Sequence, residues 1–205
     1  MKHISSRDNP LYKELKHLAT SSQARRKAAR TLLDGVHLCE AYLQHVGIPP
    51  LCVVGESMLA HAEVADIISR CESRKAECIA LPDALFHALR QVEHGVDLLF
   101  IIDTPRTEAP SVLAQSAVLL DNLQDPGNLG SILRSAAAAG IEHVFCSPGT
   151  AFSWSPKVLR AGIGAHFLLN IVESVDVAVL IQSSNVPVLA TSSHVAQPIY
   201  DIDLT

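Results

Sequence analysis

The 205-residue sequence predicts an α/β protein of two domains, and three observations carry this prediction. Apolar segments of strand length alternate with segments of helical period. A stretch rich in Pro, Thr and charge interrupts them at 104–111, and the apolar character changes after it. Strand–helix alternation indicates a parallel sheet with crossover helices. We therefore expect one domain over residues 1–106, a linker over 107–116 and a second domain over 117–205.

The first domain is expected to begin with a helix over 9–19, where Leu11, Leu15 and Leu18 recur at helical spacing. Residues 24–30 predict a basic helix or turn, and 31–33 a short apolar segment. The pattern then predicts helices over 36–45 (closed by Gly47), 61–71 and 83–92 (capped near Asp83), and strands over 50–55, 77–81 and 97–103.

The second domain is expected to hold strands over 117–121, 143–147, 167–172 and 187–191. The first helix among them is expected to begin near Asn128 or Leu129, because Asn satisfies early helical N–H groups, and to end at Gly140. A second helix follows the serine before Pro156, with the proline in its first turn.

Composition narrows the class of protein. No apolar run is long enough to span a bilayer, and the N-terminus lacks an apolar signal core, so a cytoplasmic protein is expected. Five cysteines stand at irregular spacing without a C-x-x-C pair, and the ten histidines show no ligand spacing. These patterns predict buried, reduced thiols and no metal site.

The charge is distributed unevenly. The net charge is −5, but residues 1–30 carry +6, from eight Lys or Arg against two acids, and the rest of the chain carries −11. Such an asymmetry is typical of a segment that faces a polyanion. A solvated helical face with cations for solubility explains the same charges, so the charges alone leave both interpretations open.

The stretch "LLDNLQDPGNLGSILRSAAAAG" (119–140) runs from a strand through a polar turn into an alanine-rich helix whose single cation is Arg134. We expect Arg134 little more than one turn inside the helix, at the carboxyl edge of the sheet, where ligands bind in open α/β sheets. A helix N-terminus favours anions, and an arginine adds a bidentate fork for phosphate. The alternative is a surface arginine whose stem covers apolar side chains.

A second group of cations lies in "FSWSPKVLRAGIGAHF" (152–167), where Lys157 and Arg160 are expected to share one helical face. Together with Arg134 they are the only Lys or Arg from residue 107 onward, which predicts an anion site at these two helices. A dinucleotide site at Gly162 and Gly164 is excluded, because these glycines follow a helix and precede a strand.

These stretches resemble a known family. "NLQDPGNLGSILRSAAAAG" matches the N-x-x-D-P-x-N-x-G-x-I-x-R-x-A signature of SpoU/TrmH-type RNA ribose methyltransferases of the SPOUT class. "SPKVLRAGIGAHF" is similar to the family's following segment, with Gly162 where a serine is common. "ISSRDNPLYKELKHLATSSQARRKAARTLLDGVHLCEA" resembles the N-terminal RNA-binding domain of many members, which has a ribosomal-protein-like α/β fold.

The resemblance implies a homodimeric enzyme that transfers a methyl group from S-adenosylmethionine to a ribose 2′-hydroxyl of ribosomal or transfer RNA. It implies that Arg134 is the catalytic arginine and that Asn122 and Asn128 shape its turn. RNA contacts are expected from seven cations of the two domains: Arg7, Lys13, Arg25, Arg26, Lys27, Lys157 and Arg160.

The chain departs from the family pattern after "PVLATSSHVAQPIYDIDLT" (187–205), because it lacks the glycine-rich turn and the S-L-N run of the family's knotted cofactor pocket. The SPOUT-type domain is therefore expected to be incomplete at its C-terminus, with a partial pocket at Ala190, Thr191 and Ser192. The chain alone is expected to be inactive, and its dimerisation is left open. The alternative is a non-catalytic RNA-binding module or remnant of the same family; a small-molecule enzyme is disfavoured because no nucleophile–base arrangement is present.

Overall fold

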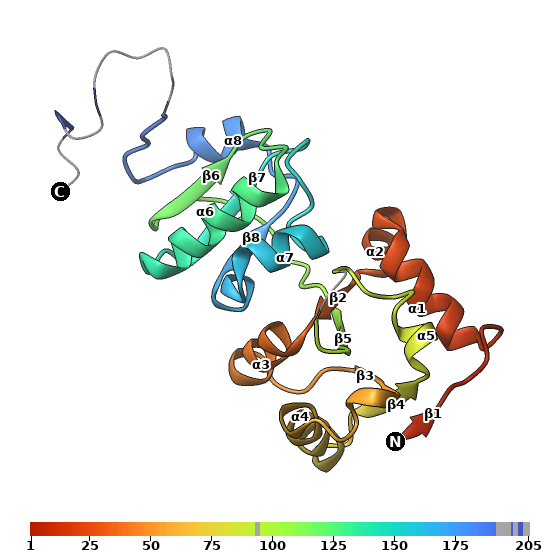
Figure 1. Ribbon diagram of the computed structural model, residues 1–205. Helices are drawn as coiled ribbons and strands as arrows, with labels where there is room; N and C mark the ends of the chain where they lie inside the picture. The colour runs from red at the N-terminus through yellow and green to blue at the C-terminus, as the bar shows by residue number, and fades with distance from the viewer. Residues whose placement is uncertain (93–94, 192–197, 199–200, 203–205) are drawn as a thin grey trace.

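The computed structural model describes all of the chain except residues 93–94, 192–197, 199–200 and 203–205. Figure 1 shows an N-terminal unit, coloured red to yellow-green, beside a C-terminal unit, coloured green to blue, with helix α7 where they meet. Among the described residues, no helix is long and apolar enough to cross a membrane.

The N-terminal unit contains a five-stranded sheet with strand order β1-β4-β3-β5-β2. Its strands are β1 (Lys2–His3), β2 (Arg30–Asp34), β3 (Leu51–Gly55), β4 (Glu77–Leu81) and β5 (Leu98–Asp103). Its helices are α1 (Pro10–Thr20), α2 (Ser22–Ala28), α3 (Val36–His45), α4 (Ala62–Ser73) and α5 (Asp83–Phe86), with the 3₁₀ turn η1 (Glu56–Met58). Helices α1, α3 and α4 and strands β3, β4 and β5 lie close to where the sequence pattern predicts them, whereas β1 and η1 were not predicted and α5 is shorter than expected.

In the sheet of the N-terminal unit, β1, β4 and β3 run parallel to one another, whereas β5 is antiparallel to both of its neighbours. β5 runs antiparallel to β3, with Cys52 opposite Phe100, and antiparallel to β2, with Leu32 opposite Ile101. The helix expected over 83–92 is only the four-residue α5, which Pro82 rather than Asp83 precedes as the cap residue. The chain leaves the helix because the N–H of Gln91 donates to Asp34 and the side chains of His87 and Arg90 bind the buried Asp97.

Two apolar cores cover the two faces of this sheet. Leu15 and Leu18 of α1 pack on one face together with Phe86. Helices α3 and α4 pack on the other face, and Trp154 and Leu159 of the C-terminal unit belong to that second core. All five cysteines are buried and free, as the sequence predicted.

The C-terminal unit contains a parallel three-stranded sheet with order β6-β7-β8. Its strands are β6 (Ala117–Leu120), β7 (His143–Cys146) and β8 (Asn170–Val172). Its helices are α6 (Pro126–Ala138), α7 (Pro156–Gly162) and α8 (Val177–Gln182), with the 3₁₀ helix η2 (Ala165–Leu168). Leu129 and Leu133 of α6 and Val158 of α7 pack on one side of the sheet, and Leu180 of α8 belongs to a separate core.

The strand expected over 187–191 was wrong for the residues that the structure describes. Residues 187–191 are irregular, and Val188 and Leu189 are exposed. The backbone pairing stops just before them, where Leu113 bridges Ser184 and accepts a hydrogen bond from the N–H of Asn185. An apolar segment becomes a strand only when a neighbouring strand supplies partners for its backbone N–H and C=O groups.

The two units share residues across the expected linker. The buried hydroxyl of Thr31 in β2 donates to the carbonyl of Trp154 at 2.7 Å, and Tyr42 of α3 contacts Phe167 edge to face with ring centroids 5.4 Å apart. The core of the N-terminal unit therefore extends across the boundary at 107–116 into the segment 152–167.

Candidate functional site

The turn after β6 is held against the loop after β7. Asn122 has the left-handed φ of +50°, and its N–H donates to the hydroxyl of Ser147 at 2.8 Å. Gly149 approaches the Asn122 side chain so closely that a Cβ at Gly149 would lie 2.7 Å from Oδ1. Asn122 therefore lies in a turn that is held against the loop after β7.

Helix α6 begins earlier than expected. It starts at Pro126, and the cap is Asp125, whose Oδ1 accepts a hydrogen bond from the N–H of Asn128 at 2.7 Å. Asn128 lies exposed inside the first turn. Asp125 caps the helix instead of Asn128 because its side chain accepts an early helical N–H and because Pro126 follows it. The first helical position has no intrahelical use for an N–H, so a proline is well tolerated there.

The earlier start moves Arg134 relative to the helix terminus. Arg134 is the ninth residue of α6, more than two turns from its start, and not little more than one turn as expected. At 3.6 residues per turn, Asn128 and Arg134 are separated by about 120° around the helix axis. The side chain of Arg134 is exposed and has no hydrogen-bond or ion-pair partner among the described residues. It is therefore available to a ligand, whereas the dipole of the helix start favours anions near Asn128.

Close packing fixes α6 on α7. A Cβ on Gly130 would lie 2.4 Å from the Cβ of Ala161 and 2.8 Å from the carbonyl oxygen of Val158. Only a glycine allows the two helices to cross at this distance. The glycine of the sequence signature thereby positions the helix that carries Arg134.

Lys157 and Arg160 are three residues apart in α7 but differ in exposure and contacts. Helix α7 begins as expected, with Ser155 as its cap and Pro156 at its first position, and Lys157 is exposed. Arg160 is half-buried and donates from Nη1 to the carbonyl of Gln91 at 3.0 Å. Arg160 turns toward the N-terminal unit because that carbonyl and the partly buried carboxylate of Asp34 lie there. Desolvation raises the pKa of Asp34, and the nearby Arg160 opposes this rise by favouring the charged carboxylate.

Arg25 was wrongly expected to contact RNA. Its side chain is buried, and Nη1 donates to the carbonyls of Leu18 at 2.5 Å and Ala19 at 3.3 Å. Burial lowers the pKa of this guanidinium. Arg25 joins α2 to the end of α1, because the last carbonyls of a helix lack intrahelical donors and accept such a cation.

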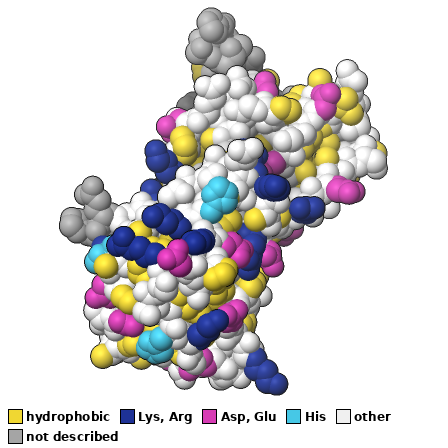
Figure 2. Space-filling model, turned by 90° about the vertical axis from the view of Figure 1, so that its right-hand side faces the viewer, with side chains coloured by type: hydrophobic (Ala, Val, Ile, Leu, Met, Phe, Trp, Pro, Cys, Tyr) yellow, Lys and Arg dark blue, Asp and Glu magenta, His cyan; other side chains and the backbone are white. Residues whose placement is uncertain are grey.

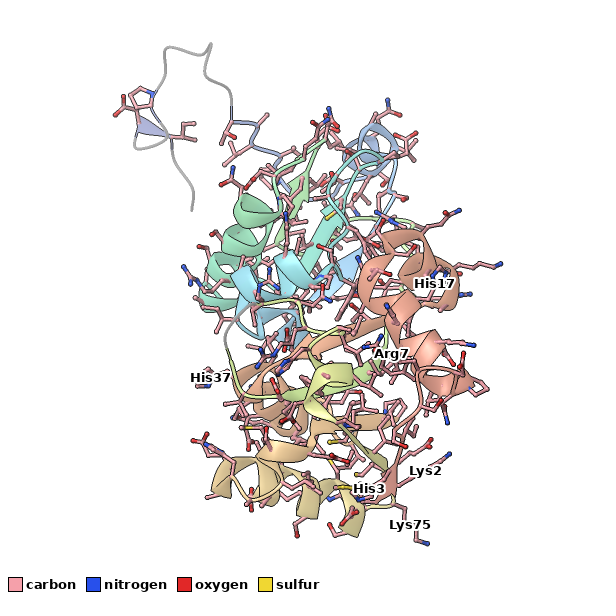
Figure 3. All side chains as sticks on the ribbon, turned by 45° about the vertical axis from the view of Figure 1, so that its right-hand side comes forward. Lys2, His3, Arg7, His17, His37 and Lys75 are labelled. Atoms are coloured by element: carbon pink, nitrogen blue, oxygen red, sulfur yellow. The ribbon has the colours of Figure 1, made fainter. Side chains whose placement is uncertain are left out.

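The other N-terminal cations lie on the surface. Arg7 and Lys13 line a shallow hollow of about 370 Å³ with Lys16 and His17, and Lys13 also pairs with Asp8 at 2.9 Å. Figure 3 shows Arg7 and His17 on the side of the molecule where α1 lies. Arg26 and Lys27 are exposed at the end of α2.

His166, which sequence reasoning did not single out, is buried beside this site. Its Nε2 lies 2.8 Å from the carbonyl of Ser153, so the ring donates from that nitrogen, and Nδ1 is buried without a partner among the described residues. Burial lowers its pKa to about 4. The ring packs against Gly162, where a Cβ would lie 2.7 Å from Cε1. No spacing signal in the sequence distinguishes such a histidine from an exposed one.

The predicted cofactor residues enclose no ligand site in the part of the chain that the structure describes. Ala190 and Thr191 are exposed in irregular chain, and Ser192 lies outside the described residues. These two described residues do not by themselves form a cradle for S-adenosylmethionine. Among the described residues, no group of three His, Cys, Asp or Glu side chains is arranged for a metal ion.

Comparison with known proteins gives consistent matches. Residues 115–205 match the SpoU rRNA Methylase family model. The chain is 31% identical over 172 residues to the 23S rRNA (guanosine(2553)-2′-O)-methyltransferase RlmP of Bacillus subtilis, covering 84% of this chain and 65% of that protein. It therefore spans slightly less than two thirds of that relative's length.

Solved structures match over similar lengths. A crystal structure of an RNA 2′-O ribose methyltransferase aligns with a TM-score of 0.63 and 28% identity, over 86% of this chain and 67% of that one. The SpoU methyltransferase AviRb from Streptomyces viridochromogenes, in complex with AdoMet, aligns with a TM-score of 0.68 and 22% identity, over 80% and 63% of the two chains. Residues 115–205 therefore form a domain of the SpoU rRNA Methylase family.

Proposed function

We propose that the protein acts in methyl transfer from S-adenosylmethionine to a ribose 2′-hydroxyl of ribosomal or transfer RNA. The observation that carries this proposal is the exposure of Arg134 on a helix whose position is fixed at both the turn and the glycine contact. Because Arg160 is engaged with Gln91, Arg134 and Lys157 are the two cations from residue 107 onward that remain on the surface.

Arg134 is suited to orientation and charge stabilisation. A guanidinium can hold the phosphate beside the target ribose with two hydrogen bonds and stabilise negative charge that develops on the 2′-oxygen. It is a poor general base, because an arginine side chain stays protonated up to a pH above about 12. Bound S-adenosylmethionine would supply the methyl group.

The N-terminal unit is proposed to bind the RNA. Arg7 and Lys13 with their neighbours at the hollow, and Arg26 and Lys27 at the end of α2, place positive charge on one side of an otherwise acidic chain. Phosphate contacts of this kind make binding weaken as salt rises, with each contact adding about one to the slope.

The test is methyl incorporation into ribosomal RNA and transfer RNA fragments from labelled S-adenosylmethionine, together with RNA affinity. Arg134→Gln should abolish the incorporation that the wild type shows while it weakens RNA binding less than ten-fold. The control Lys75→Gln, at an exposed cation outside the proposed site, should retain incorporation. Incorporation that survives Arg134→Gln unchanged contradicts the proposed role.

A second function is favoured by the exposed Ala190 and Thr191. If this chain is a non-catalytic RNA-binding module, calorimetric titration with S-adenosylmethionine should give no binding heat while RNA still binds. Saturable binding of S-adenosylmethionine in the micromolar range excludes this second function.

The assembly and location of the protein remain predictions. We propose a homodimer, which the exposure of Val179 and Ile181 on the short helix α8 supports. Sedimentation of the chain at several concentrations tests it. A cytoplasmic location, where a bacterial ribosomal or transfer RNA would be modified, is proposed with the same function.

A further inference from the structure

Arg26 and Phe152 form a stacked pair where the two units meet; we name it the seam pair. The guanidinium carbon of Arg26 lies over the Phe152 ring, 4.2 Å from its centroid. Arg26 is exposed at the end of α2, whereas Phe152 is half-buried and packs against the core that α3 and α4 cover. One face of the guanidinium rests on an aromatic ring, and the side chain as a whole is open to solvent.

Both members of the pair are held in place by their neighbours. On one side, the buried Arg25 binds the carbonyls at the end of α1 and fixes α2. On the other side, the hydrogen bond from Thr31 to the carbonyl of Trp154 fixes the segment that carries Phe152. A planar group that is already oriented loses little conformational entropy when a ligand stacks on it.

Two exposed lysines are near the seam pair in sequence: Lys27 is the next residue of α2, and Lys157 follows Phe152 by five residues at the start of α7. One acid is also close, because Glu173 accepts a hydrogen bond from the N–H of Ser153, the residue after Phe152. Figure 2 shows Lys and Arg side chains spread across the middle of the face where α1 and α2 lie, with acidic side chains among them. Point charges of this kind hold phosphates, but neither lysine offers a flat surface.

We propose that the seam pair is a stacking shelf for one unpaired nucleobase of the bound RNA. The base lies on the outer face of the Arg26 guanidinium, whose inner face rests on Phe152. Unpaired RNA bases stack on aromatic rings and on arginine planes, and a guanidinium so sandwiched also brings its charge to the neighbouring phosphate. This inference rests on the proposed function, because it takes RNA as the ligand, and it adds a base contact to the phosphate contacts.

Two probes separate stacking from charge. The first is a fluorescein-labelled single-stranded RNA of about 20 nucleotides, long enough to cover a typical single-strand site, and the second is the same backbone with abasic nucleotides. The variants are Arg26→Lys, which keeps the charge without the plane, Phe152→Leu, which removes the support, and Lys27→Gln as the matched charge control. Circular dichroism confirms that each variant is folded.

We expect Arg26→Lys and Phe152→Leu to weaken binding to the base-bearing RNA about five-fold or more. Binding of both variants to the abasic strand should equal that of the wild type, and their salt dependence should be unchanged. Lys27→Gln should weaken binding to both probes equally and lower the slope of log affinity against log salt concentration by about one.

Each other outcome contradicts either the stacking shelf or the proposed RNA binding. If Arg26→Lys binds base-bearing RNA like the wild type, or if it weakens both probes equally, the shelf is wrong and the proposed RNA-binding function stands. If the wild type binds neither probe, the proposed function fails and the shelf with it. Should Phe152→Leu unfold, the Arg26→Lys comparison decides alone.

Discussion

Acid should destabilise the fold through His166, by an amount that its burial sets. The ring is 2% exposed, and its pKa falls from the ordinary 6.5 to about 4 in the folded chain. In the unfolded chain the histidine binds a proton near pH 6.5, whereas the folded chain resists that proton. The free energy of unfolding therefore decreases as the pH falls from 6.5 toward 4 and levels off below 4. At about 1.4 kcal/mol per pKa unit, this loss amounts to about 3 kcal/mol.

The control is His166→Gln, which offers an N–H toward the carbonyl of Ser153 and has no group that titrates in this range. Urea unfolding of both proteins, at several pH values from about 7 down to 4, gives the free energy of unfolding of each. The difference between the two removes the contributions of the other titrating groups. The wild type should lose about 3 kcal/mol more than the variant over this range. Parallel pH curves for the two proteins would show that His166 is not held neutral by burial, and the reasoning would be refuted.

Three further perturbations test the packing and the site. Gly130→Ala should destabilise the fold by about 2 kcal/mol, because the new methyl group overlaps Ala161, whereas Gly127→Ala in the same helix should change stability by less than about 1 kcal/mol; urea unfolding compares them. Arg25→Ala should cost about 2 kcal/mol of stability through its lost charged hydrogen bonds but leave the salt slope of RNA binding unchanged, and a reduced slope would contradict its internal role. Thr31→Val should lower the unfolding midpoint equally by tryptophan fluorescence, from the single tryptophan at position 154, and by circular dichroism; two separate midpoints would show that the units unfold independently.

Much of the fold followed from local pattern. The apolar runs of β3, β4 and β5 are buried along nearly their whole length, so composition alone marked them as strands. Helix α1 was equally predictable, because its leucines recur at helical spacing. Asn9 caps it, with Oδ1 accepting the N–H of Leu11 at 2.9 Å. The direction of β5 did not follow, because an apolar run marks a strand without giving its direction or its neighbours in the sheet.

The candidate site was predictable in its residue types but not in its contacts. The exposure of Arg134 and Lys157 agrees with a ligand-facing role, and both were chosen because cations are scarce after residue 107. In the sequence, Arg25 and Arg160 cannot be distinguished from the exposed cations. In the structure, Arg25 binds backbone carbonyls at the end of the neighbouring helix α1, and Arg160 binds the carbonyl of Gln91, which is far away in the sequence. A count of charges cannot separate a cation that faces solvent from one that joins two elements, because only the tertiary fold brings those carbonyls close.

The shared segment 152–167 sets where this protein can be recombined. A chimera cut in the predicted linker at 107–116 would combine the Thr31 hydroxyl and the core around Trp154 with a relative's version of that segment. The N-terminal unit would then present a mismatched cavity at its core, although no residue of that unit had been changed. Exchange of the N-terminal unit between related proteins therefore requires that the stretch containing Trp154 and Leu159 be exchanged with it, so the unit that can be transplanted is discontinuous in sequence.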